Sequence, residues 1–336
     1  MDIDWGNLGF QYTDTHCHIR HVWRAGAWDA GELVESPYLN LHIAATVLHY
    51  GQAAFEGLKA FHCKDGSVRL FRPEQNARRF ATSARRICMA EVPEELFLEA
   101  VKRVVRANID YVPPYGSGGS LYVRPVLVGT GPKIGVDPAD EYTFIVLVTP
   151  VGPYYKGGLK PVRAVVLEDY DRAAPQGVGQ VKVAGNYAAS LEPHLISKKQ
   201  GFPVELYLDS REHRFVEEFG TSNFIAVTKD GTYVTAESSS ILPSITNRGL
   251  QQVAESLGMK VEVRPVEFDE IETFAEVAAC GTAVVITPVN EIVRGDRTVR
   301  VGPAEGCGPR LLEIYKRYTA IQVGDAEDEF GWTVTV

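Results

Sequence analysis

The feature that most constrains folding is a proline- and glycine-rich segment near the middle of the chain, TPVGPYYKGGLKP at 149–161. Its three prolines and three glycines break helices and strands, as is typical of a connection between folded parts. The length of 336 residues fits about two domains of roughly 150 residues each. We therefore predict domains at 1–150 and 162–336, joined by a linker at 151–161.

Hydrophobic periodicity predicts both helices and strands on each side of this linker. Before it, EYTFIVLVTPV (141–151) has the apolar run of a strand, and EELFLEAVKRVVRANIDYV (94–112) has the spacing of an amphipathic helix. After it, PVELYLD (203–209) is strand-like and TNRGLQQVAESLG (246–258) is helix-like. The predicted fold class is therefore α+β, with mixed helices and sheets in two domains.

Composition argues against several classes of function. The formal net charge of −9 gives no support to general nucleic-acid binding. No apolar run approaches the roughly 18 residues of a membrane span, and the acidic N-terminus MDIDWGNLGF lacks the pattern of a signal peptide. The five scattered cysteines do not suggest a disulfide framework. We expect a cytoplasmic protein with neither a nucleic-acid nor a membrane partner.

Two conspicuous motifs are interpreted as structural. DTHCHIRH (14–21) holds three histidines and a cysteine, but no second cluster completes the four ligands of a metal site. GTGPKIGVDP (129–138) resembles a dinucleotide fingerprint, yet its third glycine comes one residue late. We expect no metal site and interpret 129–138 as a loop. A metal- or redox-binding module built on 14–21 is the non-enzymatic alternative.

Lys182 stands between Val181 and Val183 in QVKVAGNYAASL (180–191). One interpretation is a lysine whose ammonium reaches solvent along its apolar stem. The other is an amine whose pKa is lowered by burial, so that it forms a Schiff base with a carbonyl. Pyridoxal-phosphate chemistry needs such a lysine, a carboxylate for the pyridine nitrogen and a cradle for the phosphate.

The sequence offers a candidate for each of these further groups. Glu217 and Glu218 end a predicted strand, and because adjacent strand residues face opposite sides, one can point inward while the other is solvated. A proline-led turn opens a helix near 244–246, which is a seat for an anion. A Gly-Thr turn at 281–282 offers further backbone N–H groups, and EQNARRFA (74–81) supplies two arginines. Each feature alone also has an ordinary structural explanation.

Seven motifs in order, over roughly residues 40–335, resemble the branched-chain amino-acid aminotransferases, a family of fold-type IV (class IV) pyridoxal-phosphate enzymes. The motifs are LHYGQAAFEGLKAF, NARRFATSA, LYVRPVLVGTG, VKVAGNYAASL, EEFGTSNF, SSSILPSITNRG and CGTAVVITPV. The resemblance implies a smaller N-terminal α/β domain, a larger pseudobarrel-like C-terminal domain that carries the lysine, and pyridoxal 5'-phosphate as cofactor. It also implies reversible ping-pong transfer of the amino group of L-leucine, L-isoleucine or L-valine to 2-oxoglutarate.

The resemblance further implies a role for each cofactor-binding residue. Lys182 is implied to be the catalytic residue, as the Schiff-base lysine and proton shuttle. Tyr187 is implied to lie beside the phenolic oxygen, and Glu218 rather than Glu217 to pair with the pyridine nitrogen. The residues implied to hold the phosphate are Arg79, Ile245, Thr246 and Thr282.

The resemblance also implies the residues that bind the substrate. These are Tyr50, Phe55, Tyr122, Arg124, Thr282 and Ala283. The turn at 281–283, helped by Tyr122, is implied to bind the α-carboxylate. Arg124 and Tyr50 are implied to receive the distal carboxylate of glutamate, and Phe55 is implied to form a wall of the side-chain pocket.

Related enzymes on the same scaffold remain as alternatives, namely a D-amino-acid aminotransferase and an aminodeoxychorismate-lyase-like enzyme. They share the lysine, glutamate and phosphate motifs, but the Tyr-Val-Arg segment at 122–124 suits amino acids with a second carboxylate. The family also implies a homodimer or a multiple of it, with the partner's loop 132–138 completing each site. No Cys-x-x-Cys follows the turn at 281–283, so we expect no redox switch of that kind.

Overall fold

The structure, a computed structural model, describes residues 3–152 and 159–336. Most of the predicted linker falls on 153–158 and therefore lies outside the described residues. Backbone contacts divide the described chain into two compact units, each described by itself below. The first consists of 3–152, 181–185 and 321–336, and the second of 159–180 and 186–320. The predicted domain boundaries stay a prediction. The first unit also includes 181–185 and 321–336, which lie in the part of the sequence assigned to the C-terminal domain.

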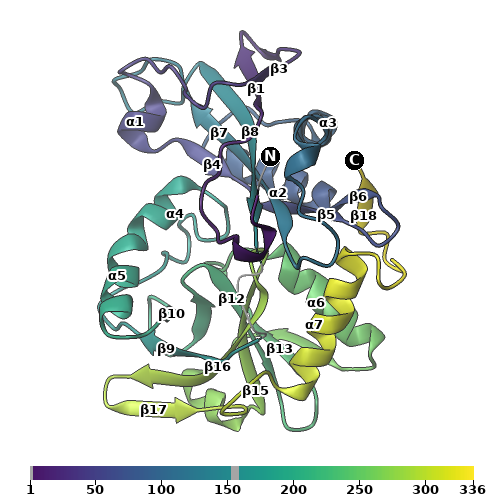
Figure 1. Cartoon of the computed structure of the whole chain (residues 1–336). Helices are drawn as coiled ribbons and strands as arrows, with labels where there is room; N and C mark the ends of the chain where they lie inside the picture. The colour runs from purple at the N-terminus through teal and green to yellow at the C-terminus, as the bar shows by residue number, and fades with distance from the viewer. Residues whose placement is uncertain (1–2, 153–158) are drawn as a thin grey trace. The chain divides into compact units, whose positions relative to one another are not determined.

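One large sheet organises the first unit (Figure 1). Its strands run in the order β18 (Thr333–Thr335), β6 (Val68–Phe71), β5 (Leu58–His62), β7 (Ser120–Gly129), β8 (Glu141–Val151), β1 (His18–Arg24) and β2 (Ala27–Trp28). β4 (Ala53–Phe55) also pairs with β7, and β3 (Glu32–Val34) with β1. Because β18 pairs with β6, the C-terminal end of the chain belongs to this unit.

Two amphipathic helices cover one face of this sheet. The helices of this unit are α1 (Thr46–Tyr50), α2 (Pro73–Arg86) and α3 (Glu94–Ala107), with 3-10 turns η1 (Trp5–Asn7) and η2 (Ile109–Tyr111). α2 begins at Pro73, because the fixed φ and missing N–H of proline suit a first helical position. Phe80 of α2, Phe97 of α3 and Phe144 of β8 are fully buried and lie with ring centroids 5.5–6.0 Å apart.

The strand register decides which residues face away from these helices. Phe144 is paired with Leu127 across β7 and β8, and both are fully buried. Side chains alternate along a strand, so Tyr122 and Arg124 of β7 lie on the opposite face from Leu127. This second face of the sheet is where most of the predicted substrate residues of the unit are found.

The second unit is built on a closed ring of strands. The ring consists of β9 (Val162–Val166), β10 (Val204–Leu208), β11 (Val216–Phe219), β12 (Ser222–Val227), β15 (Glu276–Gly281) and β16 (Val285–Arg294). β13 (Tyr233–Ala236) and β14 (Val261–Arg264) continue from β12, and β17 (Arg297–Arg300) pairs with β16. The ring agrees with the expected pseudobarrel. The mixed α+β fold class is confirmed.

The helices of the second unit cover the outside of these strands. They are α5 (Leu191–Lys199), α6 (Ile245–Ser256), most of α7 (Pro309–Gln322) and the 3-10 helix η3 (Phe268–Thr273), while α4 (Ala184–Ala189) spans the division between the units. α6 packs against β15 and β14. Within the described ranges, no helix has the length and apolar character needed to cross a membrane.

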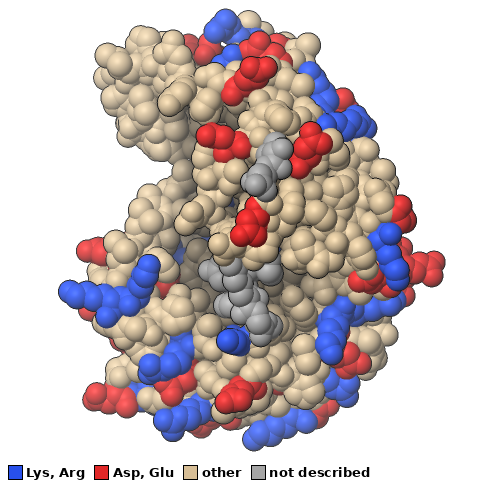
Figure 2. All heavy atoms as spheres, in the orientation of Figure 1, with Lys and Arg blue, Asp and Glu red and all other residues tan. Residues whose placement is uncertain are grey.

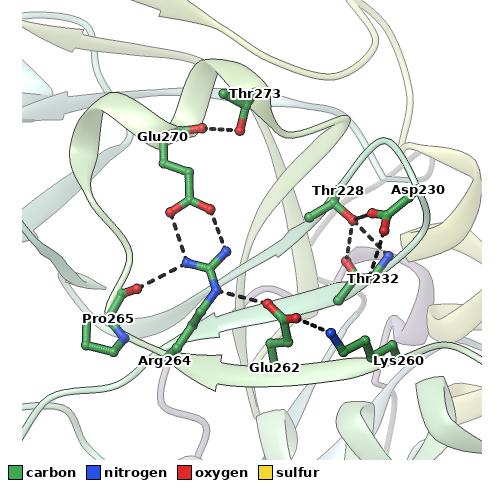
Figure 3. A network of polar contacts seen from close by, with 9 residues as sticks. All are labelled: Thr228, Asp230, Thr232, Lys260, Glu262, Arg264, Pro265, Glu270 and Thr273. Carbon is green, nitrogen blue, oxygen red and sulfur yellow. Dashed lines mark hydrogen bonds and ion pairs between the residues drawn. The ribbon is translucent and has the colours of Figure 1, made fainter.

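Charged side chains line the edge strand β14 of the second unit (Figure 3). Arg264 of β14 donates to Glu262 at 3.0 Å and to Glu270 of η3 at 2.9 Å. Lys260, which precedes β14, donates to Glu262 at 2.6 Å. Charges along an edge strand discourage pairing with another sheet. We interpret this network as structural, because all four side chains are satisfied by one another.

An apolar lobe stands out on the first unit. We call residues 43–50 and 132–136 the α1 lobe; α1 and the loop are joined by a bridge between Ala45 and Pro132. Figure 2 shows this region at the upper left with no charged side chain in view. Its exposed large apolar side chains are Ile43, Leu48, Tyr50, Ile134 and Val136. Their exposed fractions, from 41% for Tyr50 to 86% for Val136, are high for large apolar residues.

Candidate active site

Lys182 is held in the first unit by backbone hydrogen bonds on both sides. Its amide N–H donates to the hydroxyl of Ser83 at 2.9 Å, and its carbonyl accepts from the N–H of Phe55 at 3.1 Å. Val183 adds an isolated bridge to Ala54. The side chain is half-buried, and its Nζ lies 4.5 Å from the centre of the Phe55 ring. The lysine amine is therefore held against an aromatic wall.

Phe55 also contacts the predicted carboxylate receptor. The Cζ of Arg124 lies 4.8 Å from the centre of the Phe55 ring, and Nη2 donates to the hydroxyl of Tyr122 at 3.0 Å. Nε of Arg124 is buried and has no hydrogen-bond partner among the described residues. A buried donor without a partner is costly, so this guanidinium favours a ligand that supplies an acceptor. Phe55, Tyr122, Arg124 and Lys182 are thus brought together.

Two further residues of this face were not singled out from the sequence. Gly57 has no room for a side chain, because a Cβ there would lie 2.1 Å from the hydroxyl of Tyr122. Lys59 is paired with Tyr122 across β5 and β7, so their side chains share a face. Burial lowers the pKa of Lys59 to about 8. Both residues are visible in the run FEGLK at 55–59. Only the strand register shows that they lie beside Tyr122.

Tyr50 lies apart from this group in the α1 lobe. Its hydroxyl donates to the carbonyl of Ile134, and no hydrogen bond between Tyr50 and Arg124 is present in the described part of the chain. The predicted sharing of one distal carboxylate by these two residues stays a prediction. The hydrogen bond instead joins Tyr50 to the loop 132–138.

Arg79 points from α2 to a buried carboxylate. Its Nε and Nη2 donate to the two oxygens of Glu56 at 2.7 and 2.8 Å. The Glu56 side chain is fully buried, and 12% of the Arg79 side chain is exposed. Asn76 adds a third donor to Glu56 at 2.7 Å. Glu56 was not predicted as a site residue, although it directly follows Phe55 in the sequence.

Glu218 is a deeply buried carboxylate of the second unit. Arg172 lies 2.8 Å from one of its oxygens, the N–H of Leu242 donates to the same oxygen at 2.9 Å, and Asn223 donates to the other at 2.9 Å. Burial raises the pKa of Glu218, and the charge of Arg172 opposes that rise. Arg172 was missed because a lone arginine in DRAAP carries no sequence signal of its distant partner.

Glu217 corrects an expectation from the sequence. The alternation of strand residues predicted one glutamate inside and one in solvent, yet Glu217 is only 2% exposed. All four residues of β11 are buried, because the segment around Ser238 covers the side of the strand that the alternation left to solvent. The Ser238 hydroxyl donates to Glu217 at 2.9 Å, and burial raises the pKa of this carboxyl.

Tyr187 and Glu218 line one pocket of the second unit. The other lining residues are Arg172, Asn186, Gly220, Thr221 and Leu242. The pocket therefore combines a phenol, a carboxylate and a guanidinium. A carboxylate can hold a proton on a heterocyclic nitrogen, and a phenol can donate to an oxygen on the same ring.

The two predicted anion seats also lie in the second unit. α6 begins at Ile245, and its N-cap Ser244 accepts from the N–H of Asn247. Backbone N–H groups and the helix dipole at such a start favour a phosphate; Ile245 and Thr246 are both buried. Thr282 and Ala283 form the turn between β15 and β16. This turn ends at Val285 with φ 68°, a strained value for a β-branched residue that is typical of functional sites.

The histidine-rich segment 14–21 has ordinary structural partners. Nδ1 of the buried His21 lies 3.2 Å from the carbonyl of Asp29, and His16 contacts Asp110. A separate cavity is lined partly by Cys17 and His18 and contains none of the predicted site residues. The described residues hold no group of three or more His, Cys, Asp or Glu side chains placed to bind a metal ion.

Comparisons with known proteins agree with this geometry. Residues 53–292 match the family described as amino-transferase class IV. The chain is 48% identical over 341 residues to a branched-chain-amino-acid aminotransferase from Haemophilus influenzae, covering 100% of this chain and 99% of the relative. It is 44% identical over 337 residues to the enzyme of the same name from Helicobacter pylori, covering 100% and 98%.

A solved structure shows the same fold. It is the branched-chain aminotransferase from the thermophilic archaeon Thermoproteus uzoniensis, determined with norvaline. It is 26% identical, with a TM-score of 0.79 and coverage of 94% of this chain and 99% of that one. The expected fold-type IV architecture is confirmed. This chain therefore belongs to the class IV aminotransferase family.

Proposed function

We propose that this protein reversibly transfers the amino group of L-leucine, L-isoleucine or L-valine to 2-oxoglutarate, giving the branched-chain 2-oxo acid and L-glutamate. The observation that carries the proposal is the position of Arg124 beside the Phe55 ring, 4.8 Å away. The aromatic ring can pack against an aliphatic side chain. The guanidinium, with its buried Nε, can donate hydrogen bonds to a carboxylate. One pocket can thus serve two unlike substrates in turn.

The residues present fit pyridoxal 5'-phosphate as cofactor. The first unit supplies the half-buried amine of Lys182 and the guanidinium of Arg79. The second supplies the buried carboxylate of Glu218, the phenol of Tyr187 and the start of α6 at Ile245. When bound, this cofactor supplies an electron sink for the substrate's α-carbon.

In the proposed mechanism, Lys182 would hold the cofactor through its amine and would move the proton of the substrate's α-carbon. Phe55 limits the access of water to the Lys182 amine, 4.5 Å from its ring. Glu218 would hold a proton on the ring nitrogen, and Arg172, 2.8 Å from one of its oxygens, opposes the rise that burial causes in the pKa of Glu218. These roles follow from the protonation each group requires.

The remaining residues bind and orient. Arg79, Ile245, Thr246 and Thr282 would hold the phosphate, and Tyr187 would donate to the phenolic oxygen. The turn with Thr282 and Ala283 orients the substrate's α-carboxylate together with Tyr122. Arg124 receives the distal carboxylate of glutamate. Because the amino group would stay on the loaded enzyme after the first product leaves and before the second substrate binds, we expect ping-pong kinetics.

A panel of L- and D-amino acids tested with 2-oxoglutarate decides the reaction, with glutamate formation as the readout. We expect activity with L-leucine, L-isoleucine and L-valine. Activity confined to D-amino acids, or release of pyruvate from aminodeoxychorismate without amino transfer, would contradict the proposal. A metal assay of the purified protein checks the histidine-rich segment separately.

We further propose that the active species is a homodimer or a multiple of it. The α1 lobe exposes five large apolar residues, with Val136 86% exposed, and such a patch is typical of an interface. Because Tyr50 is hydrogen-bonded to Ile134, the lobe supplies Tyr50 to the partner's substrate together with the loop 132–138. Light scattering at assay concentration tests this, and a fully active monomer would contradict it.

The cytoplasm is the proposed location. All five cysteines are free thiols, and Cys280 is buried. Thiols without disulfides are typical of a reducing compartment. Fractionation of the cells that make the protein, with the aminotransferase activity as marker, tests the location.

A further inference from the structure

We propose that Glu56 is a positioning residue that aligns the guanidinium of Arg79 for the phosphate group of the cofactor. The inference rests on the proposed function, in which Arg79 binds that phosphate. Glu56 itself touches neither cofactor nor substrate; it acts through Arg79.

The contact between the two residues is bidentate and dry. Nε and Nη2 of Arg79 donate to separate oxygens of Glu56 at 2.7 and 2.8 Å. The Glu56 side chain is fully buried, so water does not compete for its oxygens. A guanidinium is a rigid plane with five N–H donors. A carboxylate that grips one edge therefore fixes the direction in which the other donors point.

The carboxylate is itself held in place. Asn76 of α2 donates to Oε2 at 2.7 Å, and the N–H of Gly57 donates to the same oxygen at 3.2 Å. Asn76 and Arg79 are three residues apart on one helix and meet the same side chain. Glu56 is thus fixed by donors from its own segment and from α2, as a group that orients another side chain must be.

The same short segment also holds the lysine. Phe55, one residue before Glu56, donates its N–H to the carbonyl of Lys182 at 3.1 Å. Ser83, one turn after Arg79 in α2, accepts from the N–H of Lys182 at 2.9 Å. Residues 55–56 and α2 therefore set the position of both Lys182 and Arg79. The cofactor would bond to Lys182 and place its phosphate on Arg79, so the distance between these two residues would decide whether it fits.

A purely structural role for Glu56 makes a different prediction. If Glu56 only neutralises a half-buried arginine, its loss lowers stability and weakens every ligand alike. If it aligns Arg79 for a phosphate, its loss weakens only ligands that carry the phosphate. Pyridoxal, which lacks the phosphate but keeps the aldehyde and the ring, separates the two roles.

The test compares the binding of pyridoxal phosphate and pyridoxal to full-length wild type and Glu56→Gln after removal of bound cofactor. We expect Glu56→Gln to bind pyridoxal phosphate about 10- to 100-fold more weakly, the loss typical of a hydrogen bond to a charged group. Pyridoxal binding should change by less than about 2-fold. Glu94→Gln is the matched control, because Glu94 pairs with the neighbouring Arg78 at the surface.

Equal weakening of both ligands, or no weakening, would overturn the role of Glu56. If Glu56→Gln does not fold, Arg79→Lys gives the answer, because a lysine keeps the charge but lacks the fork. Wild-type affinity of Arg79→Lys for pyridoxal phosphate would overturn the proposal. Borohydride reduction and mass spectrometry of the wild type separate this proposal from the proposed function. If no cofactor is found on Lys182, the proposed function itself is contradicted. If the cofactor is found on Lys182 but Glu56→Gln binds pyridoxal phosphate as the wild type does, only the role of Glu56 is contradicted.

Discussion

The amide N–H of Lys182 donates to the hydroxyl of Ser83, a residue 99 positions earlier in the chain, at 2.9 Å. Ser83 is fully buried in α2, and its hydroxyl also donates to the carbonyl of Arg79 at 3.0 Å. One hydroxyl thus links the backbone of the proposed phosphate arginine to that of the proposed cofactor lysine. The helix that carries Arg79 therefore also sets the position of Lys182.

Ser83→Ala should lower both stability and cofactor loading. The change leaves the buried N–H of Lys182 without its acceptor, which costs about 1–3 kcal/mol. Urea unfolding and the absorbance of bound cofactor measure the two effects. Thr82→Ala is the matched control, because Thr82 makes the same bond to the carbonyl four residues before it, also at 3.0 Å, but is exposed. Equal losses in both variants would show that the contact with Lys182 is unimportant.

Glu218→Gln and Glu217→Gln should differ strongly although both side chains are buried. Glu218→Gln removes the negative charge beside Arg172 and leaves an amide that cannot hold a proton on the ring nitrogen, so removal of the α-proton should slow strongly. Glu217→Gln resembles the protonated form that burial favours, so activity should change little. Single-turnover rates with leucine measure both, and equal damage would contradict the assignment of Glu218.

Glu217 also predicts a pH dependence of stability. Burial raises its pKa above the ordinary value of 4.5, so the folded protein holds this proton more tightly than the unfolded chain. The stabilisation is complete below the unfolded pKa and is lost as pH rises through the folded pKa. As pH rises from about 4 to 8, the free energy of unfolding of wild type should therefore fall relative to that of Glu217→Gln. A difference that does not change with pH would contradict the raised pKa.

Arg172→Gln should move the acid limb of the pH–rate profile upward. Arg172 opposes the rise that burial causes in the pKa of Glu218, so without it Glu218 becomes protonated at higher pH. Arg172→Lys should restore part of the shift, because the charge returns without the fork. Arg163→Gln removes a surface pair with Glu291 of the same unit and should leave the profile in place. An unchanged limb in Arg172→Gln would show that Arg172 does not set this protonation.

Arg124→Leu should separate the two half-reactions. Loss of one member of a buried charge pair costs about 3–5 kcal/mol, so the reaction with glutamate should slow on the order of 10²–10³-fold. Leucine needs the Phe55 wall but no cation, so its half-reaction should change far less. Single turnovers of the loaded enzyme with each amino acid measure the rates separately. A similar fall with both would place Arg124 on the shared α-carboxylate.

The sequence was sufficient for much of the fold. Apolar runs predicted strands β8 and β10, and amphipathic spacing predicted helices α3 and α6. Seven motifs in family order predicted the class IV fold. Each motif is a short stretch of consecutive residues and can therefore be recognised without knowledge of the tertiary structure. Lys182 was a candidate from the sequence because an amine between Val181 and Val183 conflicts with its apolar neighbours.

Only the tertiary structure decided which charges meet. Glu56 and Arg79 are separated by 23 positions, Arg172 and Glu218 lie further apart still, and nothing local marks either pair. The burial of Glu217 was mispredicted because strand alternation says which way a side chain points but not what covers it. Pairing and burial depend on segments brought together by sheet closure and helix packing, and a local pattern contains no information about those distant surfaces.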